Sequence, residues 1–232
     1  MRRIMIKISG EAMSGDKTTG FDEKVLNDIY EQIAPSIEKK IEICILLGGG
    51  NFIRGRDLLS IDKYKADQIG MLSTVMNGIY FKEFLKSENI KSSLYSAFKC
   101  DGIVDLFDKN KAEEDLLNGK IVLFVGGTGH PYFTTDTGVV LRALELNCTE
   151  VLLAKSIDAV YDDDPKINKN AKKYDTITYD EILNKNLKVV DLSSITLAKD
   201  NNLKLHIFSS NEKDALKKAM LGEKIGTIIN GG

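Results

Sequence analysis

Two uninterrupted apolar runs, at residues 43–47 and 121–125, constrain the fold of this chain more than any other feature of its sequence. Both runs are too short for a typical helix, both are rich in isoleucine, leucine and valine, and both stop at glycine. A run of this kind is typical of a strand that helices cover on both faces of a parallel sheet. The two runs therefore predict an α/β protein with a mainly parallel central sheet.

Strand-like runs alternate with longer amphipathic segments along the rest of the chain. Because only three prolines occur and no low-complexity tract marks a linker, we expect residues 1–232 to form a single domain. Ile69, Leu72, Met76 and Ile79 recur at helical spacing and predict a face packed against the core. The expected strands lie at 3–8, 42–47, 92–97, 121–125, 150–154, 204–208 and 226–229, and the expected helices at 22–38, 65–86, 111–117, 137–146, 179–183, 192–199 and 213–221.

The charge balance excludes a general affinity for polyanions. With 32 basic and 34 acidic residues, the net charge of −2 provides no field that would attract nucleic acid or an anionic membrane, so any anion site must be local. No apolar run reaches membrane-spanning length and the N-terminal one is too short for a signal peptide, so we expect a cytoplasmic protein. The three cysteines lack metal-ligand spacing, and Cys44 fits a buried strand position.

Glycine follows a strand-like run at three places, at Gly10, at 48–50 and at 126–129, and the last two loops are expected to lead into helices. Glycine lets the backbone approach an anion closely, and the free N–H groups of a helix N-terminus point at the negative charge. In parallel sheets ligands bind beyond the carboxyl ends of the strands, where all three turns are expected. Three such turns exceed the needs of one mononucleotide and predict two phosphorylated ligands that face each other.

The glycine turns match neither G-x-x-x-x-G-K-[ST] nor G-x-G-x-x-G, which disfavours a P-loop kinase and a dinucleotide oxidoreductase. The residues favour phosphoryl transfer by positioning and charge neutralisation, usually with Mg²⁺. Lys7 offers a mobile positive charge and Arg54 a guanidinium fork suited to phosphate. Thr134, Thr135 and Asp136 offer hydroxyls and a carboxylate where a helix opens.

Each candidate has a simpler alternative. Lys7 could simply end an edge strand, and Thr135 and Asp136 could be no more than N-cap residues of a helix. Asp67 could hold a ribose diol or simply favour a helix start by its charge. The acidic string at 162–164, before a proline, is interpreted as a solvated turn, and no metal site is predicted there.

Histidine occurs twice, and the two positions predict different roles. His130 lies within the second glycine loop and could touch a ligand, whereas His206 lies in a strand-like run and is expected to be structural.

Six segments in order give the chain a resemblance to the bacterial uridylate kinases, or UMP kinases, of the amino-acid-kinase superfamily. The segments are KISGEA at 7–12, GGGNFIRG at 48–55, AD at 66–67 with GMLSTVMNG at 70–78, GTGHPYFTTDT at 127–137, DAVY at 158–161 with DP at 164–165, and GEKIGT at 222–227. The resemblance covers nearly the whole chain.

This resemblance implies a three-layer α/β/α sandwich that converts ATP and UMP into ADP and UDP with Mg²⁺, a step of pyrimidine nucleotide biosynthesis. It also implies a homohexamer with GTP and UTP as effectors. The implied catalytic residues are Lys7, Arg54 and Asp136. The implied ATP-binding residues are Lys7, Ile8, Ser9, Gly10, Gly50, Arg54, Lys155, Tyr161 and Asp164. The implied UMP-binding residues are Gly49, Asp67, Thr128, Gly129, His130, Pro131, Tyr132, Phe133, Thr134 and Thr135.

The chain departs from the family pattern at three places. His130 replaces a common asparagine, Ala159 replaces a usual glycine, and the segment 152–158 is one residue shorter. Two other functions stay open. A relative that phosphorylates a small acid would not need both Arg54 and Asp67, and a nucleotide sensor on the same fold should lack Lys7 or Asp136.

Overall fold

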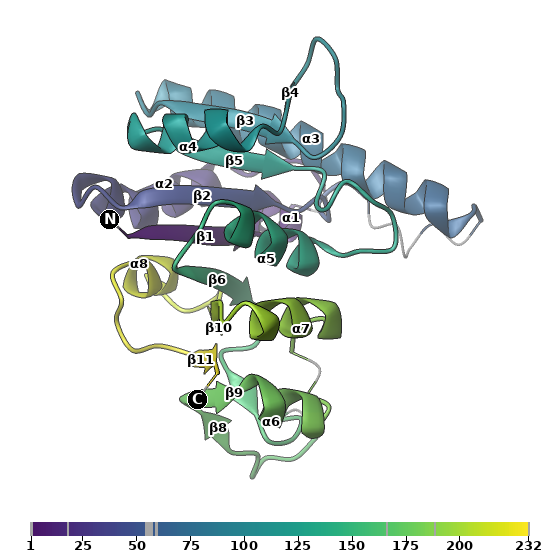
Figure 1. Ribbon diagram of the computed structural model, residues 1–232, viewed down its shortest axis with the longest axis vertical. Coiled ribbons are helices and arrows are strands. Elements are labelled where there is room, and N and C mark those ends of the chain that lie inside the picture. The colour runs from purple at the N-terminus through teal and green to yellow at the C-terminus, as the bar shows by residue number, and fades with distance from the viewer. Residues whose placement is uncertain are drawn as a thin grey trace.

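The structure is a computed structural model that describes residues 2–17, 19–53, 58, 60–165, 167–187 and 189–231. Nine strands form one sheet in the order β4-β3-β5-β2-β1-β6-β10-β11-β9 (Figure 1). Every neighbouring pair is parallel except β10 and β11. The predicted α/β class with a mainly parallel sheet is confirmed. The strands are β1 (Arg3–Ile8), β2 (Glu42–Leu47), β3 (Ser92–Ser96), β4 (Asp105–Leu106), β5 (Ile121–Val125), β6 (Glu150–Lys155), β9 (Thr176–Thr178), β10 (Lys204–Ser209) and β11 (Thr227–Asn230).

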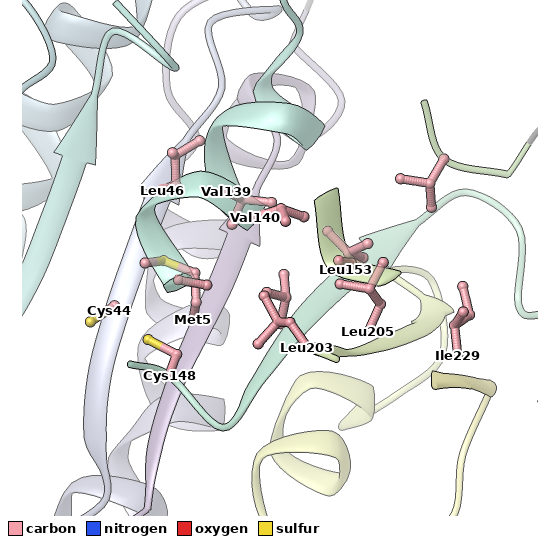
Figure 2. Packing of buried hydrophobic residues seen from close by; sticks show 14 of the residues in the cluster. Met5, Cys44, Leu46, Val139, Val140, Cys148, Leu153, Leu203, Leu205 and Ile229 are labelled. Carbon is pink, nitrogen blue, oxygen red and sulfur yellow. The ribbon is translucent and has the colours of Figure 1, made fainter. Parts of the chain in front are cut away.

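Helices cover both faces of this sheet. On one face lie α1 (Gly10–Ser14), α2 (Glu23–Glu38), α3 (Lys63–Ser87) and α8 (Ala215–Met220). On the other lie α4 (Lys109–Leu117), α5 (Thr135–Glu145), α6 (Tyr179–Asn184) and α7 (Leu192–Asp200). Successive residues of β1 pack into opposite layers. Ile4 and Ile6 belong to the first core, on the side of α2 and α3. Met5 belongs to the second core, on the side of α5 and α7, where Figure 2 shows it. None of the helices in the described part of the chain combines the length and apolar character needed to cross a bilayer.

The central strands behave as their sequence predicts. Every residue of β2 and β5 is buried. Cys44 is fully buried in the second core and acts as a small apolar side chain there. β1 lies between β2 and β6, so the alternative that Lys7 ends an edge strand is wrong. The strand that carries Lys7 is anchored on both sides.

The prediction for the apolar stripe of α3 is wrong. Leu72, Met76 and Ile79 point outward, with 53%, 44% and 39% of their surfaces exposed. The opposite face of α3 is buried. From Ala66 to Gly78 most of its buried side chains are small or polar, and the large buried Phe81 and Leu85 follow only in the last turns. A Cβ on Gly78 would come within 2.5 Å of Val125 Cγ1 and 2.8 Å of Leu94 Cδ1. Because α3 packs so close to β3 and β5 at Gly78, a large side chain has no room at that point.

The starts of the helices after the glycine turns differ in detail from the expected ones. After the glycines at 48–50, the next helix among the described residues is α3, which begins at Lys63, two residues before its predicted start. The first glycine turn opens a helix that the periodicity did not predict, α1, which starts at Gly10. α5 begins at Thr135, two residues before its predicted start, and so brings Asp136 into its first turn. Short helices and helix ends carry too few periodic residues to be located by pattern.

The acidic string at 162–164 lies in the connection of a small hairpin. β7 (Val160–Tyr161) pairs antiparallel with β8 (Lys173–Tyr174), apart from the main sheet. Asp162, Asp163 and Asp164 are exposed in the connection, where Asp163 accepts hydrogen bonds from Asn168 and from the Asp164 backbone. The interpretation of this string as a solvated turn fits these contacts.

Candidate active site

A cavity of about 400 Å³ opens at the carboxyl edge of the sheet, where all three glycine turns meet. β1, β2 and β5 each deliver one turn to its wall. The lining residues that the sequence had singled out are Lys7, Ser9, Gly10, Gly49, Gly50, Asp67, Thr128, His130, Tyr132, Phe133, Thr134 and Thr135. The fold therefore brings together residues that lie up to 128 positions apart, from Lys7 to Thr135.

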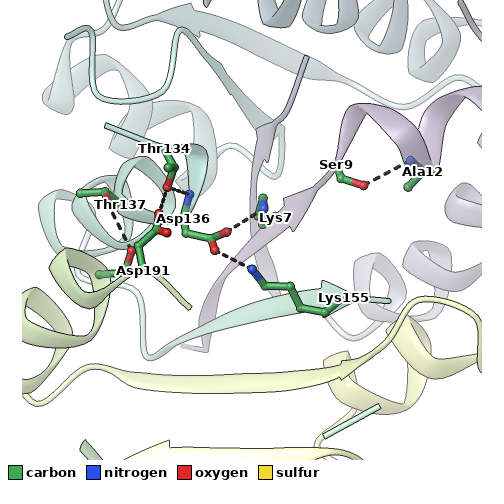
Figure 3. A network of polar contacts seen from close by, with 9 residues as sticks. Lys7, Ser9, Ala12, Thr134, Asp136, Thr137, Lys155 and Asp191 are labelled. Atoms are coloured by element: carbon green, nitrogen blue, oxygen red, sulfur yellow. Dashed lines mark hydrogen bonds and ion pairs between the residues drawn. The ribbon is translucent and has the colours of Figure 1, made fainter. Parts of the chain in front are cut away.

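Two lysines converge on one carboxylate beside this cavity (Figure 3). Lys7 Nζ lies 2.6 Å from Asp136 Oδ1, and Lys155 Nζ lies 2.5 Å from Asp136 Oδ2. Asp136 is only 7% exposed. Burial alone would raise the pKa of its carboxyl, but the charges and hydrogen bonds of Lys7 and Lys155 outweigh that effect and lower the pKa. Asp136 is thus held as a carboxylate that fixes two ammonium groups.

The N-terminus of α5 places Asp136. Thr134 is the N-cap of this helix, and its Oγ1 accepts a hydrogen bond from the Asp136 amide at 3.2 Å. The residue that caps α5 also holds a residue of the site, as the sequence allowed. The cap is Thr134, however, and not Thr135 or Asp136. At the first glycine turn, Ser9 caps α1 and accepts from the Ala12 amide at 3.2 Å.

The first two glycine turns pack directly against each other. A Cβ on Gly10 would lie 2.4 Å from the backbone nitrogen of Gly50, and a Cβ on Gly50 would lie 2.5 Å from Glu11 Oε1. A side chain at either position would push the turns apart. Glycine is required here for close approach of two backbones.

Asp67 links the start of α3 to the loop at 130–133. Its Oδ2 accepts from Lys63 Nζ at 2.7 Å and from the Tyr132 amide at 2.8 Å. Partial burial acts to raise the pKa of Asp67, but these two hydrogen bonds outweigh it and lower the pKa. Tyr132 has a φ of 71°, and Lys63 Nζ stands 5.2 Å from the centre of its ring. Asp67 therefore keeps its charge at the cavity wall and also holds the loop.

The remaining predicted site residues do not line this cavity. Ile8 is buried, and its carbonyl accepts from the Gly48 amide at 2.8 Å. A Cβ on Gly129 would lie 2.8 Å from the Ala97 carbonyl oxygen. Tyr161 stands in the β7 hairpin, where its hydroxyl donates to Asp158 at 3.0 Å. Asp136, Lys155, Pro131 and Asp164 are also absent from the lining, and Arg54 lies outside the described residues.

His130 lines the cavity, as the sequence allowed, and its amide donates to Thr128 Oγ1 at 3.2 Å. His206 is structural in its contacts, because it is 3% exposed in β10 and its Nε2 lies 2.7 Å from the Ile225 carbonyl oxygen.

Two buried asparagines support the glycine turns, and sequence reasoning had assigned them no role. Asn77 Nδ2 donates to the Gly48 carbonyl at 2.5 Å and to Asn51 Oδ1 at 2.7 Å, and Asn51 Nδ2 donates back to Asn77 Oδ1 at 3.0 Å. Thr74 Oγ1 accepts from the Gly126 amide at 2.6 Å. Polar side chains on the inner face of α3, Asn77 and Thr74, therefore hold two glycine turns in place. The sequence did carry a signal for Asn77, because an asparagine in the middle of a helix that packs on a sheet needs hydrogen-bond partners if it is buried.

No three or more His, Cys, Asp or Glu side chains gather as a metal-binding group among the described residues. Mg²⁺ often binds through one or two carboxylates together with phosphate oxygens and water, without an all-protein cage. The side chains at this site fit an ion carried by phosphate groups better than a resident metal centre.

Comparison with known proteins identifies the family. The model of the amino acid kinase family matches residues 2–209, and the chain belongs to this family. The uridylate kinase of Alcanivorax borkumensis is 43% identical over 98% of this chain and 91% of its own length. The uridylate kinase of Mycoplasmopsis pulmonis is 42% identical over 96% of this chain and 93% of its own. The crystal structure of UMP kinase from Bacillus anthracis superposes with a TM-score of 0.94 at 36% identity and covers 99% of this chain and 96% of that one.

Proposed function

We propose that this chain is a UMP kinase, which transfers the γ-phosphoryl group of ATP to UMP and releases ADP and UDP, a reaction of pyrimidine nucleotide metabolism. Uridylate kinases that match almost its whole length support this activity. The structural observation that carries it is the pair of lysines fixed by one buried carboxylate at the edge of the glycine-lined cavity.

The attacking group needs no general base. In the reaction an oxygen of the UMP phosphate bonds to the γ-phosphorus, and the bond from that phosphorus to the oxygen bridging to the β-phosphate breaks. A phosphate monoester is largely dianionic at pH 7, because its second pKa is about 6. Asp136 already accepts from two ammonium groups, so its role is to orient Lys7 and Lys155. Catalysis then consists of positioning and charge neutralisation.

The two lysines are proposed to neutralise charge on the transferred group. Lys7 lines the cavity and is 13% exposed at its side chain, while Lys155 is 19% exposed. Because Asp136 holds both, their ammonium groups need little reorganisation when substrate arrives. Preorganised charge of this kind is the largest single contribution in many enzymes. Ile8, Ser9, Gly10, Gly50, Tyr161 and Asp164 are proposed to complete the ATP side, together with Arg54.

On the UMP side, Asp67 is proposed to accept hydrogen bonds from the ribose hydroxyls. Its carboxylate stays charged and stands at the cavity wall, and an ionised carboxylate has lone pairs for several donors. Gly49 is proposed to approach the UMP phosphate with its backbone. The loop at 128–135 would surround the base, with His130 at the position where the family resemblance implies a common asparagine.

Release of ADP with different acceptors tests this function. We expect ADP release to depend on UMP and to be weak with small carboxylic acids, because Asp67 and the loop at 128–135 have no partner on a small acid. CMP and dUMP in the same assay measure the contributions of the base and the 2′-hydroxyl. Release that depends on a small acid and not on UMP would contradict the proposal.

Mg²⁺ is proposed to arrive with ATP and to be held by phosphate oxygens and water. When bound, it would neutralise part of the triphosphate charge. Removal of Mg²⁺ with EDTA should abolish ADP release, and restoring it should recover the rate.

A homohexamer in the cytoplasm is also proposed, on the family resemblance. The outward Leu72, Met76 and Ile79 of α3 support contact between copies, since a row of large exposed apolar side chains is costly on a lone molecule. Light scattering on the purified chain and on Met76→Lys tests this: the variant should have a lower mass.

GTP and UTP are proposed as effectors. A second cavity, of about 360 Å³, lies where α3 ends and β3 and β5 begin, at the other edge of the sheet from the glycine turns. Four lysines line it: Lys82, Lys86, Lys91 and Lys120. In a chain with a net charge of −2, such a group attracts a polyanion such as the triphosphate of GTP.

A further inference from the structure

Asp191 occupies the N-cap position of α7, but its side chain does not cap that helix. No hydrogen bond joins its side chain to the amides of α7. An aspartate at this position normally accepts from the second or third amide of its own helix. Its Oδ2 accepts instead from the hydroxyl of Thr134, the N-cap of α5 (Figure 3). The carboxylate therefore acts between two helices.

This contact fixes the direction of one hydroxyl group. Thr134 Oγ1 donates its single hydrogen to Asp191 and accepts from the Asp136 amide at 3.2 Å. Because a hydroxyl has one hydrogen and two lone pairs, the bond to Asp191 leaves a lone pair facing the Asp136 amide. The negative charge also polarises the hydroxyl and makes its oxygen a better acceptor.

A second set of contacts holds Asp191 in register with α5. Thr137 Oγ1 lies 2.8 Å from Ser193 Oγ and 3.4 Å from Ser194 Oγ. Thr137 and Ser194 are buried, 6% and 0% exposed. Ser193 is exposed, so the contact with Ser194 is the buried one. The hydroxyls thus join the first turns of α5 and α7, so Asp191 cannot shift relative to Thr134 without breaking these contacts.

We propose that Asp191 is a positioning residue for phosphoryl transfer. It orients the Thr134 hydroxyl, which fixes the first turn of α5, and thereby holds the Asp136 carboxylate where Lys7 and Lys155 meet it. Neither the sequence motifs nor the contacts that line the cavity assign it a role. The proposal rests on the proposed UMP kinase activity, so the wild-type chain assayed in parallel tests that activity separately.

Substitution of Asp191 tests the proposal by kinetics. We expect Asp191→Ala to lower kcat about tenfold, the effect of losing one hydrogen bond to a charged group, with KM for ATP and UMP changed less than about twofold. Asp191→Asn keeps an oxygen that can accept from Thr134 and should recover kcat to within about threefold of wild type. An Asn variant as slow as the Ala variant would overturn the proposal, as would an Ala variant with normal kcat while the wild type is active.

Asp108 provides the matched control. It is the N-cap of α4, is not among the residues that line the cavity, and its carboxylate accepts from the Lys111 amide at 3.0 Å. Asp108→Ala should lower Tm through loss of a helix cap and leave kcat unchanged. If Asp191→Ala gives the same pattern, Asp191 is only structural and the proposal fails.

A second variant and a readout without substrate complete the test. If Asp191 acts through Thr134, the double variant Asp191→Ala with Thr134→Val should have the same kcat as Thr134→Val alone. If the two substitutions instead lower kcat independently, so that their effects multiply, Asp191 does not act through Thr134. Amide hydrogen exchange at Asp136, followed by NMR without nucleotide, should be at least about tenfold faster in Asp191→Ala than in Asp108→Ala. Equal exchange in the two variants would overturn the proposal even if the chain did not phosphorylate UMP.

Discussion

The two lysine groups of this molecule lie at opposite edges of one sheet and differ in how they are held. Lys7 and Lys155 meet at a single buried carboxylate beside the glycine-lined cavity. At the other edge, Lys86 pairs with Glu83 at 3.3 Å and Lys120 with Asp115 at 2.6 Å, each through a carboxylate of its own. The first group is fixed on one carboxylate before any ligand arrives, whereas the lysines of the second group converge on no common partner.

This difference suggests that the first lysine group serves catalysis and the second serves binding of an effector. A reaction gains from charge that is already in place, because no reorganisation is then needed at the transition state. Binding of an effector needs only a net attraction, which exposed lysines provide and which salt screens. The contrast predicts large losses for changes at the carboxyl edge of the sheet and small, salt-dependent ones at the amino edge.

Loss of Lys7 should have the largest effect. We expect Lys7→Ala to lower kcat at least about a hundredfold, the scale for losing one preorganised charge, while UMP binding stays largely intact. Steady-state kinetics and calorimetric titration with UMP measure the two quantities. A near-normal kcat would remove Lys7 from the mechanism and end the contrast between the two lysine groups.

Loss of the Asp67 charge should affect binding of one substrate. We expect Asp67→Asn to raise KM for UMP at least about tenfold, because a hydrogen bond to a charged group contributes about 1.5–3 kcal/mol, with KM for ATP unchanged. The comparison of the two KM values is its own control. Equal changes in both would mean that Asp67 acts mainly by holding the Tyr132 loop.

At the amino edge, we expect a smaller effect that salt removes. Lys82→Ala combined with Lys91→Ala should raise the GTP concentration for half-maximal activation about threefold, since exposed charges each contribute less than about 1 kcal/mol. The rate without GTP should not change. The shift should shrink as NaCl rises from low to high concentration. A wild-type chain that ignores GTP would contradict the effector proposal itself.

The smallest expected effect concerns acid stability. The pKa of Asp136 is lowered in the folded chain. Its ionised form therefore stabilises the fold above the unfolded pKa of about 3.9. This contribution is lost as the pH falls through the lower pKa of the folded chain. Between about pH 5 and pH 3, Tm should therefore fall more steeply for the wild type than for Asp136→Asn. If Tm falls equally steeply with pH in both proteins over that range, the Asp136 carboxylate does not stabilise the fold.

The residues differ in how far their sequence context predicts them. The glycine turns and Lys7 could be found because a strand that is buried on both faces ends where a ligand binds, and pattern alone locates such strands. The outward face of α3 could not, because periodicity shows that Leu72, Met76 and Ile79 share a face but not which face meets the sheet. Gly78 decided that, by allowing contact with Val125 and Leu94.

The sequence by itself determined the class of the sheet, the positions of its central strands and the types of side chain offered at their carboxyl ends, because these follow from local pattern and from chain direction. Only the tertiary structure decided that Lys7, Asp136 and Lys155 form one cluster, and that Asp191 reaches α5 instead of capping its own helix. Such contacts join strands and helices far apart in the chain. Their distances depend on how the layers pack, which no local pattern of residues records.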